Sequence, residues 1–141
     1  MDFHIAPYAD IGPLGFGMGK AEVRQTLPGV PREFRKTPLS KNLTDDYGFC
    51  HVFYDQANRL VAVEFWPSDD AKLILDGADL LSTPYAQLRD SLAQTDEALE
   101  EDDMGFTSPR YGVGASAPSA LSDCGAPPAD SIIVFNRGYY D

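Results

Sequence analysis

Two segments with strand character flank a short polar turn between residues 49 and 66, and this pairing constrains the fold more than any other feature of the chain. Bulky residues fill the positions from 49 to 54, so both faces of the first segment carry large side chains. Residues 55–58, three of which are polar, make a tight connection, and residues 59–66 return as a second apolar segment. Together they predict an antiparallel β-hairpin.

Two other segments have helical character. The first spans about residues 19–27, carries a weak apolar face and ends at a Pro-Gly pair. The second begins near Thr83, which is placed to cap it, with Pro84 at the first helical position. Apolar residues then recur at helical spacing as far as Leu92, which predicts a helix with one buried face.

The remaining segments complete a fold dominated by strands. Residues 132–135 form an apolar run that predicts a strand, and residues 116–130 are rich in Ala, Pro, Ser and Gly, which is typical of a loop. Many short strands with two or three helices predict an α+β fold, a mainly antiparallel sheet with the helices packed on it. The 141 residues fit a single domain, 1–141, because no linker composition separates the halves.

The two halves of the chain follow a similar plan. Residues 23–27 match residues 88–92 at an offset of 65, and a Tyr-Gly pair opens a strand segment at Tyr47 and again at Tyr111, an offset of 64. In each half a helix precedes several strands. We therefore expect two pseudo-repeated halves, about residues 11–66 and 73–141.

Charge separates these halves. The chain has 22 acidic and 11 basic side chains, for a net charge of −11. Residues 1–66 hold 8 acidic and 7 basic side chains, whereas residues 67–141 hold 14 acidic and 4 basic ones. Such a polyanion repels phosphate backbones and anionic membrane surfaces, so we expect neither nucleic acid nor membrane as a partner. A protein with a basic surface is the natural complement.

The acidic excess is greatest between residues 96 and 103, where six of eight residues are carboxylates. Three interpretations remain open: a solvated surface that aids solubility, a docking surface for a basic partner, and a divalent-metal site. The spacing of a calcium-binding loop is absent, and no metal site is predicted. The predicted partner-binding residues are the six carboxylates of this run, a second acidic pair and three aromatic residues near presumed edges: Asp96, Glu97, Glu100, Glu101, Asp102, Asp103, Asp69, Asp70, Trp66, Tyr139 and Tyr140.

Catalytic patterns are missing from the sequence. The two histidines are His4, in an N-terminal segment expected to fray, and His51, within a strand. The glycines of residues 12–19 lack the spacing of a phosphate-binding loop and indicate a strand that enters a helix through a tight turn. Cys124 has no cationic neighbour in the sequence that would activate it as a nucleophile. We predict no catalytic residues, no cofactor and no enzymatic activity.

Two further features of the sequence predict the cellular location of the protein. The N-terminus has no secretory signal pattern, and no apolar run approaches the length of a membrane span. We therefore expect a soluble, cytoplasmic protein. Cys50 and Cys124 are expected to be free thiols in that reducing compartment.

Residues 11–23, with the pattern GPLxFGMxxxEV, resemble a recurring bacterial pattern that introduces the first helix of small α+β domains. The core of this motif resembles the repeat unit of β-lactamase inhibitor proteins and of small outer-membrane assembly lipoproteins, which place helices on an antiparallel sheet and bind other proteins. With residues 54–65 and the acidic second half, the chain also resembles immunity proteins of bacterial polymorphic-toxin systems. Gly19 replaces the usual Thr or Ser cap, and the absence of a signal or lipobox cysteine counts against the secreted and lipoprotein roles.

The resemblance implies a cytosolic immunity protein that binds and neutralises a cognate toxin carrying a basic surface. An adaptor or structural domain without a toxin is the first alternative. A small-molecule enzyme with a site between the halves is the second, and a deep polar pocket with a perturbed carboxylate would favour it.

Overall fold

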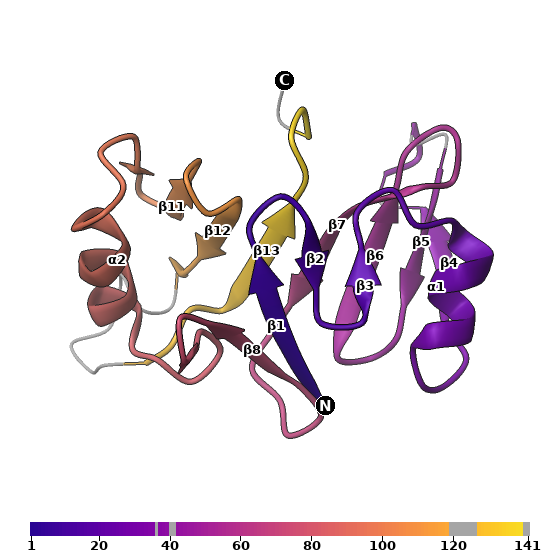
Figure 1. The fold of residues 1–141 in the computed structure, drawn as a ribbon, viewed down its shortest axis with the longest axis horizontal. Helices are drawn as coiled ribbons and strands as arrows, with labels where there is room; N and C mark the ends of the chain where they lie inside the picture. Colours follow the sequence, from indigo (N-terminus) through magenta and orange to yellow (C-terminus); the bar gives the residue numbers. More distant parts are fainter. Residues whose placement is uncertain (36, 40–41, 119–126, 140–141) are drawn as a thin grey trace.

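The computed structural model describes residues 1–35, 37–39, 42–118 and 127–139. It contains two β-sheets (Figure 1). One sheet has the strand order β3-β2-β1-β8-β9, and the other has the order β10-β11-β12-β13-β7-β6-β5-β4. The strands are β1 (Asp2–Ala6), β2 (Asp10–Ile11), β3 (Leu14–Gly15), β4 (Arg32–Arg35), β5 (Leu43–Asp46), β6 (Cys50–Tyr54), β7 (Leu60–Phe65), β8 (Lys72–Leu75), β9 (Ala78–Asp79), β10 (Glu100–Glu101), β11 (Gly105–Ser108), β12 (Val113–Ser116) and β13 (Ser131–Phe135). The helices are α1 (Lys20–Thr26) and α2 (Tyr85–Ala93). Of the described strand pairings only β1 with β8 is parallel, so the fold is α+β and mainly antiparallel, as predicted.

The eight-stranded sheet is built from two consecutive series of strands. β4 to β7 lie side by side in chain order, and so do β10 to β13. The two series meet where β7 pairs with β13, with Phe65 opposite Ile132 and Val63 opposite Val134. The predicted hairpin is confirmed as β6 and β7, with a register shift at Phe53 and Tyr54. The predicted strand at residues 132–135 is confirmed as part of β13.

Both predicted helices are present, with small differences at their ends. α1 begins after Gly19, which offers no side-chain cap, and ends before the Pro-Gly pair. The capping role predicted for Thr83 is wrong, because Pro84 occupies the cap position of α2. The Thr83 hydroxyl instead donates to the backbone oxygen of Asp79 at 2.7 Å, which closes the turn before the helix.

The N-terminus differs from the expectation of a frayed segment. Residues 2–6 form β1, and three of its residues, Asp2 to His4, pair in parallel with β8. The N-terminal ammonium also donates to the backbone oxygen of Asp70 at 3.0 Å. Hydrogen bonds to a segment about 70 residues away therefore hold this end of the chain, and a local sequence pattern could not reveal them. The predicted loop of residues 116–130 lies partly outside the described residues, which omit 119–126, the segment that contains Cys124.

The main hydrophobic core joins both sheets and both helices on one side of the eight-stranded sheet. Fully buried side chains come from β1, α1, β7 and β8, for example Phe3, Val23, Phe65 and Leu73. The rings of Phe3 and Phe65 lie 5.0 Å apart, which places the five-stranded sheet directly on the larger one. Cys50 is a buried free thiol, and burial raises its pKa.

A buried ion pair connects α1 to the sheet. Asp45 in β5 is 0% exposed, and its two carboxylate oxygens accept hydrogen bonds from Arg24 at 2.6 and 3.0 Å. The Tyr54 hydroxyl donates to the same carboxylate at 2.9 Å, and burial raises the pKa of this hydroxyl. Arg24 also pairs with Glu33 at 2.8 Å, and the hydrogen bonds to these two carboxylates raise the pKa of the guanidinium.

We expect Arg24→Met to lower the free energy of unfolding by about 3 kcal/mol, because it leaves the Asp45 carboxylate buried without its cation. Urea denaturation followed by circular dichroism measures this loss. The control is Arg32→Met, since the Arg32 side chain is 81% exposed and pairs with Asp46 at 3.4 Å. This control should change stability by less than about 0.5 kcal/mol. Equal losses in the two variants would contradict the importance of the buried pair.

Candidate functional site

The acidic run of the sequence folds into a turn and a short hairpin at one end of the eight-stranded sheet. We call residues 96–105 the acidic hairpin. It follows α2, forms the edge strand β10 and turns back into β11, with Glu100 opposite Thr107 and Glu101 opposite Phe106 (Figure 1). Because β10 has only one described neighbour in the sheet, its carboxylates lie at an edge.

Asp96 is buried, which corrects its prediction as a contact residue. It is 5% exposed, and its carboxylate accepts hydrogen bonds from the Ser108 hydroxyl at 2.6 Å and from the backbone amides of Ala98 and Arg110 at 3.0 and 3.2 Å. Burial alone would raise the pKa of Asp96, but these hydrogen bonds outweigh it and hold the pKa below its ordinary value. Asp96 therefore anchors the start of the acidic hairpin to β11 instead of facing a partner.

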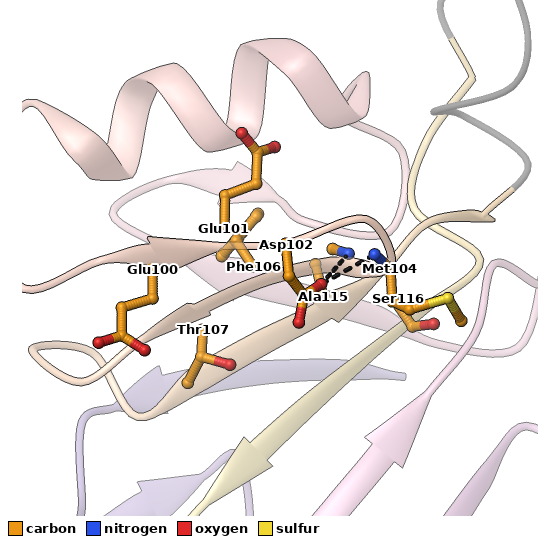
Figure 2. A pocket seen from close by; sticks show the side chains of 9 residues that line it. Glu100, Glu101, Asp102, Met104, Phe106, Thr107, Ala115 and Ser116 are labelled. Carbon is orange, nitrogen blue, oxygen red and sulfur yellow. Dashed lines mark hydrogen bonds between the residues drawn. The ribbon is translucent and has the colours of Figure 1, made fainter.

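Glu101 ties the hairpin to α2. Its carboxylate accepts a hydrogen bond from the Tyr85 hydroxyl at 2.7 Å and one from the Arg89 guanidinium at 3.3 Å. Burial, followed by the bond to Glu101, raises the pKa of the Tyr85 hydroxyl. In Figure 2 the Glu101 side chain points toward the helix, while Glu100 points to the other side of the hairpin.

Asp102 and Gly105 fix the tip of the hairpin. The Asp102 carboxylate accepts hydrogen bonds from the backbone amides of Met104 and Gly105 at 2.8 and 3.0 Å (Figure 2). Gly105 is required here because a Cβ at this position would lie 1.8 Å from the backbone oxygen of Ala115. This close approach allows β11 and β12 to pair immediately after the turn.

The other three carboxylates of the run, Glu97, Glu100 and Asp103, are exposed. Within the described part of the chain, none of them makes a hydrogen bond or ion pair. Met104 lies next to them and is 54% exposed, so an apolar side chain adjoins the exposed carboxylates. A hollow of about 240 Å³ opens beside the hairpin, with Glu100, Glu101, Asp102 and Met104 along its rim.

The structure places the remaining predicted contact residues elsewhere. Asp69 and Asp70 lie in the loop between β7 and β8, beside the N-terminus and away from the acidic hairpin (Figure 1). Trp66 follows β7, and its ring centroid lies 4.8 Å from that of His51. Tyr139 stacks on Phe135 at 6.3 Å, and burial raises the pKa of its hydroxyl. Tyr140 lies outside the described residues.

Trp66 therefore has a neighbour that sequence reasoning did not select as a contact residue, His51. The alternation of β6 was visible in the sequence, and it placed His51 on the face opposite Cys50 and Val52. What the sequence could not supply was the register that brings Trp66 and Glu64 beside it. Among the described residues there is no group of three His, Cys, Asp or Glu side chains placed to hold a metal ion.

The arrangement favours recognition of positive charge. Carboxylates on a fixed backbone attract ammonium and guanidinium groups, and an exposed apolar side chain at the same tip adds a dehydrated contact.

No family model, curated protein or solved structure matches the chain. The interpretation of this site therefore depends on its own geometry and charge.

We expect Asp96→Asn to destabilise the protein by about 1–3 kcal/mol. The neutral amide has one acceptor oxygen, so it cannot replace the charged carboxylate as acceptor of all three hydrogen bonds. Since the pKa of Asp96 is lowered by folding, its contribution is present above the ordinary aspartate value of 3.8 and is lost as the pH falls further. Urea denaturation should give a difference between wild type and variant at pH 7 that shrinks below about pH 4. Glu97→Gln, at an exposed neighbour, is the control and should be nearly neutral at both pH values.

Proposed function

We propose that this chain is a binding protein that recognises a basic protein partner through the acidic hairpin. The observation that carries the proposal is that some carboxylates of the acidic run are hydrogen-bonded within the protein, whereas others are exposed. Asp96, Glu101 and Asp102 are used inside the molecule, and their hydrogen bonds hold the hairpin in place. The exposed carboxylates of Glu97 and Glu100 are thereby displayed on an ordered backbone, which reduces the entropy lost on binding.

The overall charge supports the same kind of partner. At −11 the chain attracts a basic protein over distances of about 8–10 Å and accelerates association. Local carboxylates then select the correct orientation. The same charge disfavours nucleic acid and anionic membranes, which we propose are not partners. Within the described residues, neither helix is long or apolar enough to cross a membrane.

We propose specifically a cytoplasmic immunity protein that neutralises a cognate bacterial toxin. The support is the resemblance of residues 11–23 to the motif of small inhibitory domains, together with the acidic surface. Toxins that act on nucleic acids carry basic grooves, and an acidic inhibitor would compete for such a groove. An adaptor with another basic partner remains the alternative, and it differs from the first proposal in having no toxin to neutralise.

The two halves of the chain, residues 11–66 and 73–141, are proposed to be pseudo-repeats. The support is their element order, because each contains a helix followed by four strands that lie side by side in the large sheet. Under this proposal the halves share a scaffold, and the second half has acquired the charged edge.

The proposal of an immunity protein is tested by co-expression. The proposal expects a toxin domain to be encoded in a gene beside this chain's gene. The neighbouring genes are sequenced for such a domain, which is then expressed in a sensitive bacterium, alone and together with this chain. Restored growth and a complex that elutes as one species in gel filtration are the expected results. Growth arrest in the presence of the folded chain would contradict the immunity role.

We expect the triple variant Glu97→Gln, Glu100→Gln, Asp103→Asn to slow association with that partner several-fold, because it removes three exposed charges from the hairpin. Biolayer interferometry measures the rate at low salt and at about 0.15 M salt, where screening should reduce the difference. The control removes three exposed charges outside the predicted contact residues, by Asp2→Asn, Glu22→Gln and Asp76→Asn. If the control slows association equally, the partner responds to net charge, and the role assigned to the hairpin is wrong.

A further inference from the structure

The helices and the smaller sheet pack on one face of the eight-stranded sheet. α1 reaches it through Arg24 and Asp45, α2 through the rings of Tyr85 and Phe106 at 5.7 Å, and β1 through Phe3. We call the opposite face the outer face. Its small apolar cluster consists of Phe53, Ala62 and Phe135 with turn residues packed at one end, and no described helix contributes to it.

One row of residues crosses the outer face from edge to edge. Strand register places these residues opposite one another in succession: Arg32, Asp46, His51, Glu64, Ile133, Gly114, Thr107 and Glu100. The row begins at edge strand β4 and ends at edge strand β10, in the acidic hairpin. The outer face is therefore continuous with the exposed carboxylate of Glu100.

An aromatic group lies in the first part of this row. The imidazole ring of His51 meets Phe34 and Trp66 edge to face, with centroids 4.9 and 4.8 Å apart. Its Nε2 lies 3.6 Å from an oxygen of Asp46, which in turn pairs with Arg32 at 3.4 Å. The Trp66 ring is half-buried, so its remaining surface is open to a partner.

A hollow of about 230 Å³ is lined by Glu64, the next carboxylate of the row, which lies opposite His51. Phe53, Glu64, Ser131 and Ile133 are among the residues that line it. The Glu64 carboxylate accepts a hydrogen bond from the Ser131 hydroxyl at 3.1 Å, which orients it and leaves acceptor positions unused by that bond. This hollow shares Thr107 and Ser116 with the hollow beside the acidic hairpin.

We infer that the outer face between Trp66 and Glu100 is a docking surface for arginine side chains of the basic partner. The inference rests on the proposed function and names the chemistry of its contact. A guanidinium group stacks on the indole ring while its N–H groups donate to a carboxylate, an arrangement that lysine reproduces poorly. Trp66 supplies the ring and Glu64 the carboxylate, and Glu100 extends the negative charge toward the hairpin.

Charge complementarity decides the occupant. The row contains three carboxylates, those of Asp46, Glu64 and Glu100. Its single arginine, Arg32, already pairs with Asp46, and the row contains no lysine. An acidic or purely apolar partner would leave Glu64 desolvated without a cation, at a cost in binding free energy. A partner with exposed arginines satisfies Glu64 and covers Trp66 in the same contact.

Trp66 makes the inference directly measurable, because it is the one tryptophan of the sequence. The probes are a hexa-arginine peptide and a hexa-lysine peptide of equal charge. We expect hexa-arginine to change the Trp66 fluorescence at saturation and to bind about threefold to tenfold more tightly than hexa-lysine. We expect Glu64→Gln to weaken hexa-arginine binding about tenfold, as loss of a charged hydrogen-bond acceptor implies.

The matched control is Glu22→Gln, which removes the same charge from the exposed surface of α1 on the other face of the sheet. It should leave the affinity for hexa-arginine within about twofold. A second variant, Trp66→Ala, is first shown to be folded by urea denaturation. Its affinities for the two peptides are then measured by calorimetry, and the preference for hexa-arginine over hexa-lysine should be smaller than in the wild type. The inference would be overturned if the Glu64 and Glu22 variants changed the affinity for hexa-arginine equally. It would also be overturned if calorimetry showed that hexa-arginine binds while the Trp66 fluorescence stays unchanged.

The outcomes also separate this inference from the proposed function. If the cognate partner binds and only the hairpin triple variant weakens it, the partner contacts the hairpin and not the outer face. If neither the adjacent gene product nor either peptide binds the folded chain, the proposed function fails as well.

Discussion

The pairing of β7 with β13 is the constraint on which the rest of the structure depends. It joins residues 62–65 to residues 132–135, about 70 positions apart in the chain, and turns two four-stranded series into one sheet. Both strands send apolar residues into the main core, where Val63, Phe65, Ile132 and Val134 are almost completely buried. Without this pairing, each series would have an exposed inner edge and half of a core.

That pairing also forms the outer face, on which we propose that a partner binds. Because one continuous sheet carries all the described helices and the smaller sheet on one face, its other face runs from β4 to β10 without a described layer over it. The register at β7 and β13 places Glu64 opposite Ile133, and so connects the aromatic group around His51 to the strands of the second half. A one-residue slip would exchange the residues of the two faces and destroy both the core and the row.

The sequence predicted elements wherever neighbouring residues determine them. The hairpin of β6 and β7 follows from alternation around a polar turn, and α2 follows from apolar spacing after a proline. The parallel pairing of β1 with β8 escaped prediction because nothing within residues 2–6 specifies a partner in residues 72–75. The burial of Asp96 escaped for the same reason, since its hydrogen-bond donor Ser108 lies on a strand that returns after the turn.

Charge in the acidic run has a structural role as well as a solvating one. If the run served only solubility, its carboxylates would need no donors, because water satisfies them at no cost to folding. Three of the six accept hydrogen bonds from protein groups, and one of these, Asp96, is buried at the base of the hairpin. The chain thus uses half of the run to order the backbone that displays the other half. Such ordering favours a specific interface over diffuse electrostatic attraction, because it fixes the spacing between the displayed charges before a partner arrives.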